Sequence, residues 1–162
     1  MYDLVEQALV NSEITTDLRD RYVDRREGLI ALVHPMDRVP KTSLLTKFVP
    51  WLSELLAERN QEQEHPLRLR VAIHPGDVPY DEAGWFGEDI DIAIDLLDAL
   101  VAKDRSRQAP PSLVVVVSDQ IHRSVIKHGY DGIDARLFEP LIKLEVGGGQ
   151  CVGWVHVPGE SL

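Results

Sequence analysis

The feature that most constrains the fold of this chain is an uninterrupted apolar run, LVVVV, at residues 113–117. Valine is branched at Cβ, which restricts its side chain in a helix and suits it to the pleated surface of a sheet. A strand without polar alternation is typical of a sheet that is covered on both faces. We therefore expect a central, buried strand over 113–119. A helix over 120–129 should follow, because Ser118 or Asp119 can cap it.

The rest of the chain alternates between helical and extended patterns. In chain order, the sequence predicts a helix over 2–11, strands over 18–24 and 29–34 joined near Gly28, a helix over 44–60, a strand over 67–78, a helix within 84–100, the strand and helix above, and a terminal hairpin from 141–146 and 151–157. Thr42 or Ser43 can cap the helix over 44–60, and Pro50 either kinks or splits it. Loops are expected between Pro35 and Pro40, at 80–84, and over 102–112.

Strands that alternate with helices favour an α/β (α+β) two-layer sandwich. A chain of 162 residues is the size of one domain, and we expect a single domain over 1–162.

The segment 84–100, GWFGEDIDIAIDLLDAL, carries two stripes at helical spacing. The apolar stripe, which we expect to face the core, is Ile90, Ala93, Ile94, Leu97 and Val101. The acidic stripe is Glu88, Asp91, Asp95 and Asp98. Carboxylates four residues apart repel each other by a few tenths of a kcal/mol. The acidic stripe has three interpretations: a solvated face, which is the commonest, a docking surface for a basic partner, or a site for Mg²⁺, Ca²⁺ or Mn²⁺.

The overall charge restricts the kinds of partner. The chain carries 17 Lys and Arg against 27 Asp and Glu, a formal net charge of −10 at pH 7. This charge argues against non-specific nucleic-acid binding and against attraction to anionic membranes. The longest apolar run is too short to span a bilayer, and the acidic N-terminus lacks the features of a signal peptide. The single cysteine, Cys151, excludes an internal disulfide, so we expect a cytoplasmic protein.

Other chemistry-bearing residues have ordinary structural interpretations. His74 follows a predicted strand beside Pro75 and Gly76 and is interpreted as a turn residue, since no zinc-type spacing of His and Cys is present. Cys151 lies in an alternating strand and is expected to be a small buried hydrophobe. An arginine cluster in the first predicted hairpin either binds phosphate or an acidic partner or, as we favour, forms surface ion pairs. Its members are Arg19, Arg21, Arg25 and Arg26, and the neighbouring acids are Asp17, Asp20, Asp24 and Glu27.

Four segments, taken in order, resemble class III nucleotidyl (adenylate/guanylate) cyclase domains of the small actinomycete type. They are RREGLIALV at 25–33, LRLRVAIHPGDV at 67–78, GWFGEDIDIAIDLLDA at 84–99 and VVVVSDQIHRSVI at 114–126. The resemblance covers most of 18–157, with 1–17 as an N-terminal helix and connection. It implies a ferredoxin-like, class III cyclase-type fold with a C-terminal β-hairpin. The chain begins at what looks like the helix after the family's first strand, so that strand is expected to be missing.

The resemblance also implies that the family's reaction is lost. Class III cyclases use two Asp residues to hold two metal ions against a nucleoside triphosphate. One of those positions falls on Glu27, whose carboxylate is displaced by about 1.5 Å, roughly one C–C bond, and Arg26 replaces the preceding Gly. The family's Asn and phosphate-binding Arg fall on Asp91 and Asp95. A carboxylate reverses the sign of that contact, and losing one transition-state charge contact costs about 3–4 kcal/mol.

These positions predict a catalytically inactive cyclase-homology domain, not an enzyme, that acts as a protein-interaction or regulatory module. We expect it to be a homodimer or part of a complex. Partner or phosphate contacts would come from Arg25, Arg26, Glu88 and Asp98. The alternative is a divergent metal-dependent nucleotide cyclase, or a nucleotide-binding sensor, with Glu27, Asp91 and Asp95 as ligands of Mg²⁺ or Mn²⁺. No cofactor is expected under the favoured interpretation, and nucleotide binding is disfavoured.

The missing first strand is the second reason to expect a partner. That strand is central in the family's fold, so its absence would leave unpaired backbone groups beside it. Three outcomes are open: the strand over 113–119 rearranges, a partner chain donates a strand, or a second copy swaps one in.

Overall fold

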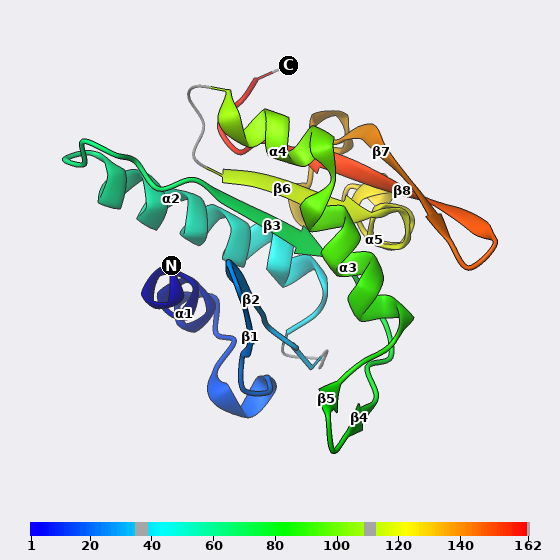
Figure 1. The fold of residues 1–162 in the computed structure, drawn as a ribbon. Helices are drawn as coiled ribbons and strands as arrows, with labels where there is room; N and C mark the ends of the chain where they lie inside the picture. The colour runs from blue at the N-terminus through cyan, green and yellow to red at the C-terminus, as the bar shows by residue number, and fades with distance from the viewer. Residues whose placement is uncertain (35–38, 109–112, 162) are drawn as a thin grey trace. The chain divides into compact units, whose positions relative to one another are not determined.

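In the computed structural model, the valine run forms β6 (Leu113–Ser118), and every one of its residues is buried. β6 pairs in parallel with β3 (Leu69–Ile73) and antiparallel with β8 (Gly149–His156). β8 in turn pairs antiparallel with β7 (Glu139–Val146), which gives a mixed, four-stranded sheet in the order β3-β6-β8-β7 (Figure 1). The predictions of a buried interior strand and of a terminal hairpin are confirmed.

The structure describes residues 1–34, 39–108 and 113–161. Along the chain these fall into two units, Met1–His65 and Pro66–Leu162, and each is described by itself. Both are mixtures of helices and strands, so the expected α/β (α+β) class is confirmed at that level. In the described part of the chain, every helix is too short or too polar to cross a membrane.

The core of the second unit lies between the sheet and two helices, α3 (Glu88–Asp98) and α4 (Leu100–Arg107). Side chains alternate across a strand, so two valines of β6 face this core and two face away from it. The core consists of Leu96, Ala102, Val114, Val116, Ile142, Val155 and Val157, with Ala72, Ile92, Ala99 and Leu144 packed against it. A Cβ at Gly153 would lie only 2.7 Å from Leu96 Cδ2 and 2.8 Å from Ile142 Cβ, so a glycine in β8 permits this close packing.

The structure corrects two predictions in this region. Residues 102–107, expected in a solvated loop, belong to α4. The core-facing stripe of α3 also differs from the expected one. Ile90 is buried as expected, but Leu96 is the fully buried residue and Ile92 packs with it, whereas Val101 is exposed. The physical reason is the break at Ala99, whose extended backbone (ψ 136°) ends one helix and begins the next, so a single helical period cannot run on to Val101.

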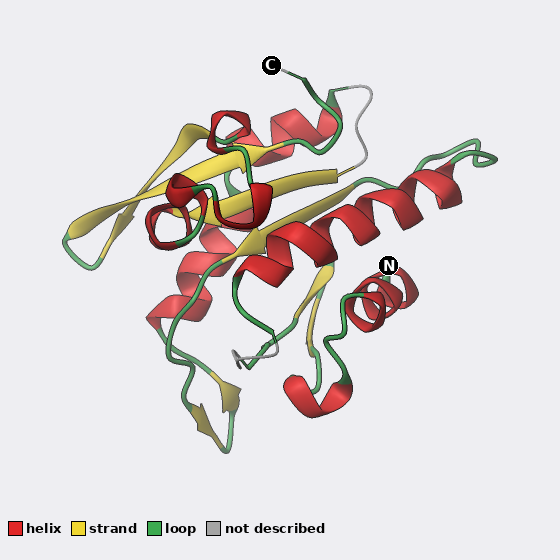
Figure 2. Cartoon of the chain, turned by 180° about the vertical axis from the view of Figure 1, so that it is seen from behind, coloured by secondary structure: helices red, strands yellow, loops and turns green. Residues whose placement is uncertain are grey.

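The opposite face of the sheet is covered by α5 (Asp119–Ser124), which Figure 2 shows from behind. The Ser118 side chain caps this helix by accepting a hydrogen bond from the Ile121 N–H at 3.4 Å. A 3₁₀ turn, Ile126–His128, extends it to Gly129, which adopts the left-handed conformation (φ 64°). The expected cap and the expected glycine stop are both confirmed. Further 3₁₀ turns at Tyr130–Gly132 and Ala135–Leu137 lead into β7.

Between β3 and α3 the chain forms a short hairpin, β4 (Tyr80–Asp81) and β5 (Gly84–Trp85). We expected only a turn at 80–84, because two-residue strands leave too short an alternation to recognise.

The first unit contains α1 (Tyr2–Asn11), a 3₁₀ turn (Thr16–Leu18), the hairpin β1 (Val23–Arg25) and β2 (Gly28–Ile30), and α2 (Val49–Asn60). The predicted helix and hairpin are confirmed, with strands shorter than expected. Arg25 pairs with Gly28 across a two-residue turn. Part of the loop predicted between Pro35 and Pro40 lies outside the described residues.

The helix predicted over 44–60 is split, as one alternative proposed. Leu44–Phe48 form a π-helical turn, in which the Val49 N–H donates to the Leu44 carbonyl, and α2 follows. Pro50 has no N–H to donate, and the wider turn before it avoids the clash that its ring would cause in a regular α-helix. Of the two predicted caps, Thr42 or Ser43, the Ser43 side chain makes no capping hydrogen bond.

Candidate functional site

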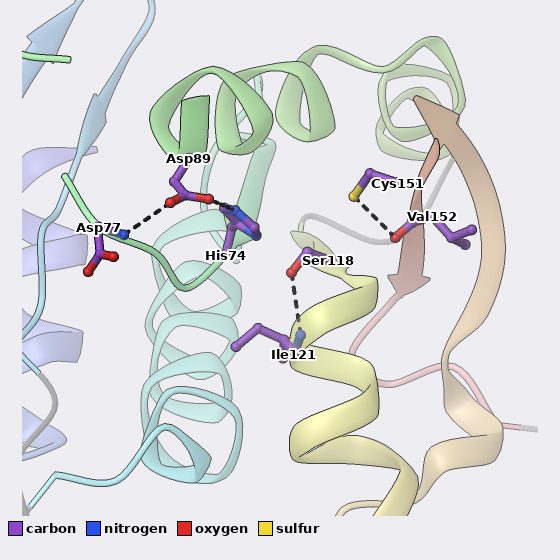
Figure 3. A network of polar contacts seen from close by, with 7 residues as sticks. All are labelled: His74, Asp77, Asp89, Ser118, Ile121, Cys151 and Val152. Atoms are coloured by element: carbon purple, nitrogen blue, oxygen red, sulfur yellow. Dashed lines mark hydrogen bonds and ion pairs between the residues drawn. The ribbon is translucent and has the colours of Figure 1, made fainter. Parts of the chain in front are cut away.

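Three residues around the carboxyl end of β3 form a polar network that links the strand to α3 (Figure 3). The His74 ring follows the last residue of β3, and its Nε2–H donates to Asp89 Oδ1 at 2.8 Å. The other carboxylate oxygen, Asp89 Oδ2, accepts the backbone N–H of Asp77 at 3.0 Å. Asp89 is the second residue of α3, where a carboxylate is also stabilised by the helix dipole. The network therefore fixes the start of α3 against the loop that leaves β3.

The His74 side chain is buried, with an exposed fraction of 5%, against 32% for Asp89. An ionised carboxylate has only acceptor oxygens, so the hydrogen bond to Asp89 requires a hydrogen on His74 Nε2. His74 Nδ1 is buried and has no hydrogen-bond partner among the described residues. A buried polar atom without a partner costs about 1–3 kcal/mol. The hydrogen bond from Nε2 to Asp89 therefore fixes the orientation of the buried His74 ring.

The loop approaches α3 so closely that Gly76 has no room for a side chain. A Cβ at this position would overlap Cβ, Cγ and Oδ2 of Asp89, all well inside the 3.0 Å that real Cβ contacts respect. The sequence HPGD indicates a turn, but the turn alone does not show that the glycine and Asp89 touch. The interpretation of His74 as a turn residue did not foresee its carboxylate partner. A signal was available in the acid at the second helical position, a place where carboxylates are favoured.

The four acids of the predicted stripe all lie on α3, and all are exposed: Glu88, Asp91, Asp95 and Asp98. Glu88 is at the first position of the helix, and its Oε1 lies beside Gly147 in the turn between β7 and β8. Asp98, in the last turn, is 3.6 Å from the Lys103 ammonium of α4. Asp91 and Asp95 are one helical turn apart, so the helix brings these two carboxylates together on its solvent side.

The other predicted site residues belong to the first unit, in the β1–β2 turn. Arg26 and Glu27 are the two exposed turn residues, and Arg25 is half-buried at the end of β1. Arg19 has a different role from the rest of the predicted arginine cluster. Its buried guanidinium donates to both oxygens of Glu6 at 2.7 and 2.6 Å.

The same guanidinium also lies 4.6 Å from the centre of the Tyr22 ring. Its ion-pair partner is an acid of α1 rather than one of the neighbouring acids that we named, because the fold brings that helix beside the hairpin's first residues. Asp20, another of the named acids, accepts from His34 at 2.7 Å.

The described residues do not fit a metal-ion centre. Within ranges 1–34, 39–108 and 113–161, His, Cys, Asp and Glu side chains nowhere form a group of three or more that could hold a metal ion. Hard divalent cations need several oxygen ligands around them, so we derive no chemistry through a metal held by Glu27, Asp91 and Asp95.

A second polar group follows β6. Asp119 accepts from the Trp154 indole N–H at 3.2 Å and from Arg123 Nε at 2.8 Å. The His122 ring stacks on Trp154 with 3.5 Å between ring centres. Cys151, on the neighbouring β8 strand, is half-buried, and burial raises the pKa of its thiol. A thiol with a raised pKa is a poor nucleophile, but Cys151 is less buried than the small buried hydrophobe that the sequence predicted.

The chain was compared with protein-family models, with curated proteins and with solved structures, and none of them matches it.

Proposed function

We propose that this chain is a degenerate class III cyclase-like domain that does not cyclise nucleotides and works instead as a protein-interaction or regulatory module. The observation that carries the proposal is the pair of exposed carboxylates, Asp91 and Asp95, on α3. They lie one helical turn apart at the positions where the resemblance calls for an Asn and a phosphate-binding Arg.

Carboxylates at these two positions disfavour the cyclase reaction. A triphosphate gathers negative charge as its α-phosphorus is attacked, and an arginine stabilises that charge by donating hydrogen bonds. Losing one such contact costs about 3–4 kcal/mol, or two to three orders of magnitude in rate. A carboxylate at the same place adds repulsion to that loss.

The sheet supports the expectation of a partner. In the order β3-β6-β8-β7, β3 is an edge strand of the four-stranded sheet of the second unit. Edge strands carry backbone groups that can pair with a strand from another chain. A strand donated by a partner or by a second copy is therefore compatible with this sheet, and we include self-association in the proposal.

The direct test is an assay of the purified protein with ATP, GTP, CTP or UTP and Mn²⁺. We expect no cyclic nucleotide above background. A cyclic product that disappears in the Glu27→Ala variant would overturn the proposal and favour the metal-dependent alternative.

A charge-reversal pair tests the electrostatic step by itself. The Asp91→Asn/Asp95→Arg variant should bind a non-hydrolysable nucleoside triphosphate more tightly than the wild type, by about tenfold or more, since one unfavourable contact becomes favourable. The matched control is Asp131→Asn, which removes a charge from an exposed position of the same unit that is not one of the predicted phosphate contacts. Equal, tight binding by all three proteins would contradict the argument.

A further inference from the structure

The hairpin β4–β5 is an exposed arm of the second unit. Tyr80 pairs with Trp85 and Asp81 with Gly84, and in the described part of the chain these two strands pair with each other alone. The turn is closed by the Ala83 N–H, which donates to Asp81 Oδ1 at 2.8 Å, and the base by the Phe86 N–H, which donates to the Pro79 carbonyl at 3.1 Å. The arm leads directly into α3 through Gly87.

The arm exposes large aromatic side chains. Tyr80 is 66% exposed and Phe86 47% exposed. The Tyr80 ring packs on Trp85, with 4.8 Å between ring centres, which is the ordinary way in which a hairpin stabilises itself. This pairing explains Trp85, but most of the surface of Tyr80 and about half of that of Phe86 stay in water. Side chains alternate across a strand, so Tyr80 and Phe86 expose one large aromatic ring on each face of the arm, and exposed apolar surface of this kind can mark an interaction site.

The charge around the arm has one sign. Between Val71 and Ala102 the sequence contains no Lys or Arg. It contains eight acids over the same stretch: Asp77, Asp81, Glu82, Glu88, Asp89, Asp91, Asp95 and Asp98. All of them except Asp89 are exposed. The arm and the first turns of α3 therefore combine aromatic faces with carboxylates, and Asp98, in the last turn of α3, lies 3.6 Å from the Lys103 ammonium.

We propose that the β4–β5 arm and the exposed acids of α3 form a docking surface for an extended, arginine-rich segment of a partner protein. The inference rests on the proposed function, because it names the partner chemistry of an interaction module. Charge complementarity identifies the occupant: a guanidinium attracts both carboxylates and the faces of aromatic rings. An extended segment also suits the arm, since each edge of a two-stranded ribbon can pair with a third strand. The same charge repels nucleic acid and anionic lipid.

The test measures binding of a fluorescent peptide that alternates arginine with valine, by anisotropy, to the full chain. The control peptide has glutamate in place of arginine. We expect the arginine peptide alone to bind, and its affinity to fall as salt is raised, because exposed charges are screened. The variant Tyr80→Ser/Phe86→Ser removes the exposed aromatic faces, and Asp91→Asn/Asp95→Asn removes two charges from α3. Each should weaken binding about tenfold, or 1.4 kcal/mol.

The matched control is Tyr130→Ser/Asp131→Asn, which changes an exposed tyrosine and an exposed acid elsewhere on the same unit. It should bind like the wild type. Thermal unfolding of each variant shows whether the fold is kept, and the α3 variant tests the surface even where the aromatic variant unfolds.

Three results would overturn the inference: no binding of the arginine peptide, equal binding by the wild type and both surface variants, or a dimer in solution that only the surface variants break and that excludes the peptide. The third result would assign the surface to a second copy. None of these results produces a cyclic nucleotide, so failure of the docking surface is distinguishable from failure of the proposed function.

Discussion

Replacing Gly76 with alanine is the sharpest test of how the loop after β3 is held against α3. A Cβ at position 76 overlaps the Cβ of Asp89 as well as its carboxylate. Rotation of the Asp89 side chain therefore cannot relieve the clash, and the loop and the helix must move apart. That movement stretches both hydrogen bonds of the Asp89 carboxylate, at 2.8 Å to His74 and at 3.0 Å to the Asp77 N–H.

The magnitude follows from two terms. Forcing an extra methyl group into a packed site costs about 1–3 kcal/mol. Hydrogen bonds to a charged group are each worth about 1.5–3 kcal/mol, and weakening them adds to the cost of a buried imidazole that already has one unpaired nitrogen. We expect a loss of about 3–5 kcal/mol in the free energy of unfolding, which corresponds to roughly 6–20 °C in Tm. This is a large part of the total stability of a typical domain.

Urea unfolding, followed by circular dichroism, measures the effect as a lower midpoint with an unchanged slope. The control is Gly149→Ala in β8, where a Cβ meets only the Val146 carbonyl at an ordinary 3.7 Å, and where we expect a change within about 0.5 kcal/mol. The second variant is Asp89→Gly, which removes the opposing Cβ, so that Gly76→Ala should cost almost nothing in that background. The reasoning is refuted if Gly76→Ala unfolds like its Gly149→Ala control, or if its cost is the same with and without Asp89.

Two further predictions come from the pKa shifts. Burial lowers the pKa of His156 and of His122, so the folded state resists protonation of both rings, whereas the unfolded state is protonated near the ordinary pKa of about 6.5. The free energy of unfolding should therefore be highest above that pH and fall as the pH drops below it. Urea unfolding at a series of pH values should show a flatter pH dependence in His156→Gln, and an unchanged pH profile would contradict the assignment. Burial raises the pKa of the Cys151 thiol, so iodoacetamide should modify the folded protein near neutral pH more slowly than it modifies a free cysteine, and the two rates should converge in urea. Equal rates for the folded protein and free cysteine would contradict this prediction.

The local patterns were reliable where one interaction decides the structure. The valine run predicted β6, Ser118 predicted a helix start, and Gly129 predicted a helix end, and all three are confirmed. These depend on side-chain shape, on one capping hydrogen bond and on one backbone conformation, which nearest neighbours in the sequence determine.

Predictions that assumed one continuous helix through residues 88–101 were less reliable. The extended backbone at Ala99 separates α3 from α4, so the predicted stripe does not continue to Val101, and within α3 the residues against the core include Ile92 and Leu96. Nothing in the spacing marks that break, because Ala99 itself and Leu100 after it are good helix formers. Burial of Ala102 against the sheet then makes residues 102–107 helical, although their polar composition is typical of a loop.

Of the candidate site, the sequence determined the acids, their helical spacing and their exposure on α3, because these follow from the residue types and the period of a helix. It also determined that no Lys or Arg lies between Val71 and Ala102. Only the tertiary structure decided that Asp89 accepts a hydrogen bond from His74, and that Tyr80 packs on Trp85 in an exposed hairpin. Both pairings join residues brought together by turns, and the distance across a turn depends on the packing of the elements on either side of it.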